Sequence, residues 1–94
     1  MNNENQEPLE QYLRPEVQSF ARLMERELRE NDWKGGWQDM TPTECFIRLQ
    51  EEVDEVELLI GRPALVRREL ESEAADVANF CMMLVEVSIL EVDR

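Results

Sequence analysis

The chain has 94 residues, of which 22 are acidic and 10 basic, so its net charge is −12 at pH 7. This charge and the absence of a basic stripe argue against binding to nucleic acid, and no apolar run approaches the ~20 residues of a membrane span. We expect one cytoplasmic domain with reduced thiols in or near its core, because Cys45 and Cys81 lie far apart and no secretory pattern precedes them.

The first elements in chain order are a polar tail and a helix. Residues 1–8 are rich in Asn and Glu and are expected to be flexible, followed by a single helical domain over residues 9–94. Pro15 fits the first position of a helix, and Gly35-Gly36 is predicted to end that helix. Its predicted buried face comprises Val17, Phe20, Leu23, Met24 and Leu28.

A second helix is predicted to begin at Pro42, because Thr41 and Glu44 can form a capping box around it. It should run to about Ile60. Its predicted buried seam, with alternating steps of three and four, comprises Phe46, Leu49, Val53, Val56 and Ile60.

Gly61-Arg62-Pro63 is predicted to break the chain, and Pro63 to start a third helix that reaches about Leu90. The fold class is therefore all-α, an antiparallel bundle of about three helices. A chain of this length has little room for a core. We expect a homodimer or a dimer of dimers to complete the bundle.

Two acidic clusters, Glu51-Glu52-Val53-Asp54-Glu55 and Glu73-Ala74-Ala75-Asp76, place carboxylates one helical turn apart. Glu73 falls in a gap of the third helix's apolar row, where a core residue is expected. A buried carboxylate costs several kcal/mol unless a cation or a donor satisfies it. A divalent metal would do so, as would an arginine from Arg67, Arg68 or a partner subunit. The apolar row comprises Val66, Leu70, Val77, Phe80, Leu84 and Val87.

The absence of histidine narrows the chemistry of such a site. Zinc hydrolase motifs, Ser–His–Asp triads and Glu-x-x-His di-iron sites all need imidazole. Carboxylate oxygens alone suit Mg²⁺, Mn²⁺ or Ca²⁺. A short connection makes the second and third helices antiparallel neighbours, so both acidic pairs can contribute to one site.

The pattern Glu-Glu-x-x-Glu, a 17-residue spacer and Glu-x-x-Asp resembles that of the MazG-like all-α nucleoside triphosphate pyrophosphohydrolases. Lys34-Gly35-Gly36-Trp37 and the segment 73–80 resemble further stretches of small bacterial and phage members. The chain departs from larger relatives because it lacks a tandem second domain and a clear fourth helix.

This resemblance implies Mg²⁺-dependent hydrolysis of (deoxy)nucleoside triphosphates between the α- and β-phosphates, with Mn²⁺ as a substitute. It assigns Glu51 to a second metal or to the attacking water, as the catalytic residue. It assigns Lys34 to a phosphate, Trp37 to the base, and Asn79 to the sugar or base. The implied metal ligands are Glu52, Glu55, Glu73 and Asp76.

Other interpretations of these residues stay open. Trp33 and Trp37 could simply cover the end of the bundle, Lys34 and Glu51 could be solvated charges, and Asn79 could bond to a neighbouring helix. The chain could instead be an acidic interaction protein that mimics nucleic acid. It could also be a related pyrophosphohydrolase that acts on dUTP, dUDP or phosphoribosyl-ATP.

Overall fold

The computed structural model describes residues 12–93 apart from 33–34, 63 and 65, and in this part of the chain it has three α-helices and no strand. The helices are α1 (Pro15–Glu30), α2 (Pro42–Ile60) and α3 (Arg67–Asp93). The expected all-α fold is therefore confirmed for these residues. The tail predicted over residues 1–8 lies outside them.

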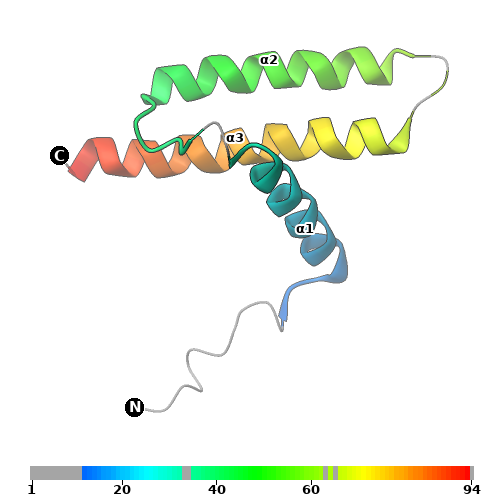
Figure 1. The fold of residues 1–94 in the computed structure, drawn as a ribbon, viewed down its shortest axis with the longest axis horizontal. Helices are drawn as coiled ribbons and strands as arrows, with labels where there is room; N and C mark the ends of the chain where they lie inside the picture. The colour runs from blue at the N-terminus through cyan, green and yellow to red at the C-terminus, as the bar shows by residue number, and fades with distance from the viewer. Residues whose placement is uncertain (1–11, 33–34, 63, 65, 94) are drawn as a thin grey trace.

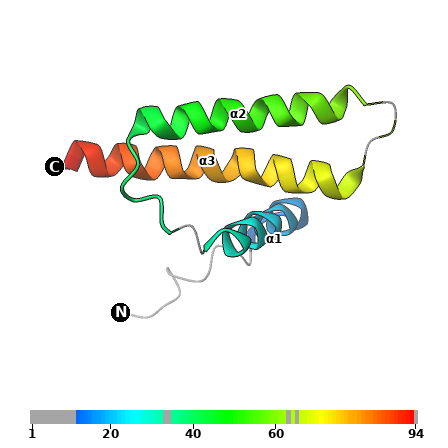
Figure 2. The same ribbon diagram turned by 45° about the horizontal axis from the view of Figure 1, so that its top comes forward.

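Helix α3 is the central element, because it packs against both α1 and α2. Figure 1 shows α2 and α3 lying antiparallel and side by side, as their short connection predicted. Helix α1 runs obliquely to this pair in Figure 1 and lies beside α3 in Figure 2. None of the described helices is both long and apolar enough to cross a membrane.

Helix α1 begins at Pro15, as predicted, but it ends at Glu30 and not at the glycine pair. Asn31 explains the earlier end. Its Nδ2 donates to the Glu27 carbonyl at 2.9 Å and its backbone N–H donates to the Leu28 carbonyl at 3.1 Å. These bonds satisfy carbonyl groups that a further helical turn would otherwise use. Gly35 then adopts a left-handed conformation, with φ of 87°.

Helix α2 has the predicted limits and the predicted capping box. The Glu44 backbone N–H donates to Thr41 Oγ1 at 3.1 Å, and the Thr41 N–H donates to Glu44 Oε1 at 2.8 Å. These two bonds satisfy donors that the start of a helix leaves without partners.

Helix α3 begins at Arg67, later than predicted. Pro63, the expected first residue, lies outside the described residues. Proline fixes φ in turns as well as at helix starts, so its position alone does not decide where the helix begins.

The inward face of α2 differs from the predicted seam. Phe46, Val53 and Ile60 are 49%, 47% and 68% exposed, whereas Cys45 and Leu59 are buried. The inward row has steps of four, three, four and three and comprises Cys45, Leu49, Glu52, Val56 and Leu59. Glu52 therefore occupies a position on this helix that normally holds a core side chain.

The other two helices also bury residues that the apolar pattern did not include. In α1, Glu27 is buried, whereas Val17 at the predicted buried face is exposed. The buried row of α3 runs through Ala75, Asn79, Met83 and Val87 in steps of four, while Val66 is exposed.

The hydrophobic core of the described chain is small, and it is centred on Cys45, Met83 and Val87. Cys45 is buried, as predicted, and burial raises the pKa of its thiol, with Glu44 adding to the effect. Cys81 is exposed, which corrects the expectation of a core or near-core position.

Candidate metal centre and adjoining cavity

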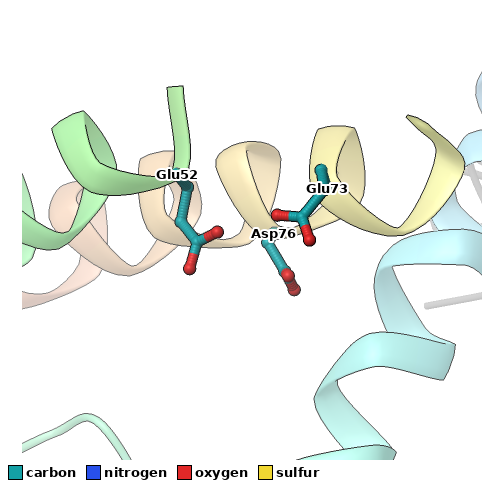
Figure 3. A group of neighbouring side chains, drawn as sticks. All are labelled: Glu52, Glu73 and Asp76. Atoms are coloured by element: carbon teal, nitrogen blue, oxygen red, sulfur yellow. The ribbon is translucent and has the colours of Figure 1, made fainter. Parts of the chain in front are cut away.

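Three carboxylates from two helices converge in the space between α2 and α3. Glu52 comes from α2, whereas Glu73 and Asp76 come from α3, and Figure 3 shows the three carboxylates grouped together, with Glu52 and Asp76 projecting to the same side of the helices. One carboxylate oxygen of each lies within 4.8 Å of the others, and all three residues are half-buried. We call these three residues the carboxylate cluster.

The local sequence explains why the cluster forms. Glu52 lies in the inward row of α2, between Leu49 and Val56. Glu73 and Asp76 lie one turn apart on α3, so their side chains share one face of that helix. The antiparallel packing of α2 on α3 then brings the two helices' carboxylates together.

This crowding of acidic groups changes the protonation of Glu52. The pKa of its carboxyl group rises from the ordinary 4.5 to about 7, chiefly because the group is partly buried. The charge of Asp76, a hydrogen bond with Glu73 and the charge of Glu73 act in the same direction, while Arg48 opposes them. Without a cation, Glu52 is therefore protonated in about half of the molecules at pH 7, because a further negative charge in this space is unfavourable.

The cluster fits a hard divalent cation. Carboxylate oxygens are the ligands that Mg²⁺, Mn²⁺ and Ca²⁺ prefer, and the cluster contains neither sulfur nor imidazole. Metal binding normally displaces protons from its ligands. A cation between Glu52, Glu73 and Asp76 would thus supply the positive charge that the Glu52 proton supplies in its absence.

Two carboxylates assigned by the resemblance lie outside this cluster. Glu55 is exposed on α2, one turn after Glu52. Glu51 is also exposed, and one of its carboxylate oxygens accepts from Arg48 Nε at 3.1 Å. Lys34, the predicted phosphate contact, lies outside the described residues, as does Trp33.

A cavity of about 260 Å³ adjoins the cluster, and all three helices contribute to its walls. Glu52 and Asp76 line it together with Arg48, Trp37, Asn79 and Phe80. Carboxylates, a guanidinium group and aromatic rings therefore face the same space. Such a combination of apolar surface and a few polar groups is typical of small-molecule sites.

Trp37 and Asn79 both lie in the cavity wall, as the predicted substrate contacts require. Each residue also has a structural role of the kind that the sequence analysis gave as the alternative to substrate contact. Trp37 packs on the core, and its Nε1 donates to Glu86 at 2.9 Å. Asn79 is only 3% exposed, and its Nδ2 donates to the backbone carbonyl of Met24 in α1 at 3.0 Å.

Two cavity residues were missed by the sequence analysis. Arg48 lies one turn before Glu52 on α2, and its guanidinium carbon is 5.3 Å from the centroid of the Phe80 ring. Residues four apart lie on the same face of a helix, so the sequence alone could have indicated that Arg48 lies beside Glu52. Glu27 is 7% exposed and lines the cavity from α1. No signal marked it, because α1 carries several other glutamates with a similar setting in the sequence.

Arginine was the alternative to a metal ion as the partner of the Glu73 carboxylate. Arg67, a proposed ion-pair partner of Glu73, instead places its Nε 3.1 Å from a carboxylate oxygen of Glu71. Glu73 itself lies beside Glu52 and Asp76 in the carboxylate cluster.

Comparisons with models of protein families, with curated proteins and with solved structures give no match to this chain.

Proposed function

We propose that this protein is a divalent-metal-dependent nucleoside triphosphate pyrophosphohydrolase. It would hydrolyse (deoxy)nucleoside triphosphates between the α- and β-phosphates, with Mg²⁺ as the cofactor. The observation that carries this proposal is the convergence of Glu52, Glu73 and Asp76 beside a cavity that also presents Arg48 and aromatic rings. The sequence resemblance supports the same reaction.

The charges around the cavity suit a metal-bound polyphosphate. Phosphoryl hydrolysis depends mainly on neutralising charge and on positioning the reacting groups. The bound metal would neutralise phosphate oxygens and lower the pKa of the attacking water. Arg48 is the cationic side chain in the described cavity wall, and it can donate to phosphate. Trp37 and Phe80 offer ring surfaces for a base.

In the proposed reaction, the oxygen of water attacks the α-phosphorus, and the bond from that phosphorus to the bridging oxygen breaks. Pyrophosphate leaves with the bridging oxygen, and the nucleoside monophosphate keeps the oxygen of water. A carboxylate accepts the proton of the attacking water. We assign this step to Glu51, which adjoins Glu52 in the sequence and ion-pairs with Arg48.

Pyrophosphate release from a panel of NTPs and dNTPs, with Mg²⁺ and with EDTA, tests this proposal. Glu73→Gln should abolish the metal-dependent release, because it removes a charged ligand but keeps the side-chain shape. Glu57→Gln is the matched control, since Glu57 is exposed on α2 and outside the carboxylate cluster. Equal activity of the Glu73 variant and the control would refute the site. Silence of the wild-type protein across the panel, together with metal-independent binding to basic proteins, would favour the acidic interaction protein.

We further propose that the active form is a homodimer or a dimer of dimers. Phe46, Val53 and Ile60 repeat every seven residues on one exposed face of α2, and each is about half or more exposed. Burying such a face against a second copy would add apolar area to a small core. Val53→Glu should lower the mass measured by light scattering after size exclusion. An unchanged oligomer would exclude this face, and a wild-type monomer would exclude the assembly.

A further inference from the structure

Trp37 is held in the cavity wall by a residue that lies outside the cavity. Its side chain is half-buried, lines the cavity and packs on the hydrophobic core, while its Nε1 donates to Glu86 Oε1 at 2.9 Å. Glu86 is exposed on α3 and is not among the described residues of the cavity wall. The bond therefore ties an aromatic ring of the wall to a carboxylate that the proposed reaction does not use.

The backbone around Trp37 does not belong to a helix, so the bond to Glu86 contributes to the position of the ring. Trp37 lies in the connection between α1 and α2, and its carbonyl accepts from the Met40 N–H at 3.0 Å, which closes a turn. Gly35, just before it, is in a left-handed conformation. Residues 35–41 pass beside the later half of α3 (Figure 1). Glu86 offers a fixed point there, because both other helices pack against α3.

The same bond decides what Trp37 offers to a ligand. Indole has a single hydrogen-bond donor, Nε1, and no acceptor, and Glu86 accepts from this donor. Trp37 therefore contacts a ligand through its ring surface, which suits stacking on the flat face of a nucleobase. The Phe80 ring in the same wall already has the Arg48 guanidinium carbon 5.3 Å from its centroid. Trp37 is thus the more available of these two rings for a base.

We propose that Glu86 is a positioning residue, which holds the Trp37 ring in place to stack on the base of a bound nucleotide. This inference rests on the proposed function, since it treats the cavity as a nucleotide site. Glu86 acts through Trp37 and touches no ligand, so losing the bond should weaken substrate binding and leave the hydrolytic step unchanged. Every base has a flat aromatic face, so both purine and pyrimidine nucleotides should be affected.

The first test compares Glu86→Leu with Glu86→Gln in steady-state hydrolysis of dATP and dCTP with saturating Mg²⁺. Both variants remove the same negative charge, but only Gln keeps an acceptor oxygen for Trp37 Nε1. The KM of the Leu variant should exceed that of the Gln variant by about 3- to 10-fold, with kcat within about twofold, because one hydrogen bond to the ring is lost. Equal KM values, or a loss confined to kcat, would overturn the inference while leaving the proposed function intact.

A second comparison shows whether the effect passes through the indole. Trp37→Phe keeps an aromatic ring but has no Nε1. In this background Glu86→Leu and Glu86→Gln should give the same KM, because neither side chain can accept a hydrogen bond from the ring. A difference in KM that persists in the Phe background would contradict positioning through this bond. If Trp37→Phe does not fold, the first comparison and the fluorescence experiment still decide.

A fluorescence experiment distinguishes failure of this inference from failure of the proposed function. The chain has two tryptophans, so Trp33→Phe leaves Trp37 as the single reporter. In this background, Trp37 emission is followed during titration with dAMP and dCMP in Mg²⁺. If no triphosphate is hydrolysed, binding of both monophosphates that is about 3- to 10-fold weaker for Glu86→Leu than for Glu86→Gln would still support the inference. Equal affinities of the two variants, or no binding to the protein with Glu86 intact, would overturn it.

Discussion

Replacing Glu52 by Gln in the metal-free protein should raise its thermal stability at pH 8 and leave it almost unchanged at pH 5. Burial and the neighbouring Asp76 and Glu73 raise the pKa of Glu52 from 4.5 to about 7 in the folded protein. Between these values the folded chain holds a proton that the unfolded chain has lost. The stability therefore falls as the pH rises through this window and is lowest above pH 7. Gln resembles the protonated carboxyl group and does not ionise.

The size of this effect follows from the pKa difference of about 2.5 units, which is 7 minus 4.5. At ~1.4 kcal/mol per unit, the upper limit is about 3.5 kcal/mol. Glu52 is only half-buried, so solvent screens much of this, and we expect about 1–2 kcal/mol. For a domain of this size, that corresponds to roughly 5–10 °C in Tm.

The assay is thermal unfolding followed by circular dichroism in EDTA at pH 5, 6, 7 and 8. The measured quantity is the Tm of Glu52→Gln minus that of wild type, so that the other carboxylates largely cancel. Glu57→Gln serves as the control for removing one exposed negative charge from α2. An identical Tm difference at pH 5 and pH 8, or a Gln variant that is less stable than wild type at pH 8, would refute this prediction.

Three further predictions concern the metal and the phosphate contacts. Millimolar Mg²⁺ should raise the wild-type Tm at pH 8 by mass action. The apparent Mg²⁺ affinity should weaken by up to ~tenfold per pH unit below 7, because the cation then competes with the Glu52 proton. An Mg²⁺ affinity that does not change with pH in titrations would contradict this prediction. Arg48→Met should raise KM for triphosphate about tenfold, since a charged donor is lost, and an unchanged KM in steady-state kinetics would exclude a phosphate contact. Glu55→Gln should retain most of the pyrophosphate release, because Glu55 is exposed and outside the cluster; inactivity equal to that of Glu73→Gln would instead make it a ligand.

Local signals in the sequence located the helices well. Thr41, Pro42 and Glu44 lie within four consecutive residues, so their capping geometry depends on no distant contact, and the start of α2 was predicted correctly. The end of α1 was missed because Asn31 and Gly35 both favour helix ends, and the sequence does not rank them.

The inward face of α2 could not be chosen from periodicity alone. This helix has apolar residues on several sides, including Phe46, Ile47 and Leu58, which are all exposed. Two sets of residues on α2, the predicted seam and the observed inward row, therefore both follow the period of an α-helix. The predicted row placed Glu52 on its flank, whereas packing on α3 places Glu52 within the inward row.

The candidate site was predictable where its residues lie on neighbouring helices. Glu73 and Asp76 are one turn apart, and the antiparallel hairpin brings Glu52 to them. The α1 wall was not predictable, because its position depends on how α1 packs against α3, which no local motif specifies. The burial of Glu27 and the bond between Asn79 and Met24 follow only from that packing.

The packing of α1 and α2 on the shared helix α3 has an evolutionary consequence. The carboxylates belong to the α2–α3 hairpin, whereas Glu27 and the anchor for Asn79 belong to α1. Substitutions in α1 would thus reshape one wall of the cavity while the hairpin keeps its three carboxylates. A lineage built on this plan can vary the cavity through a single short helix and inherit the carboxylate cluster unchanged.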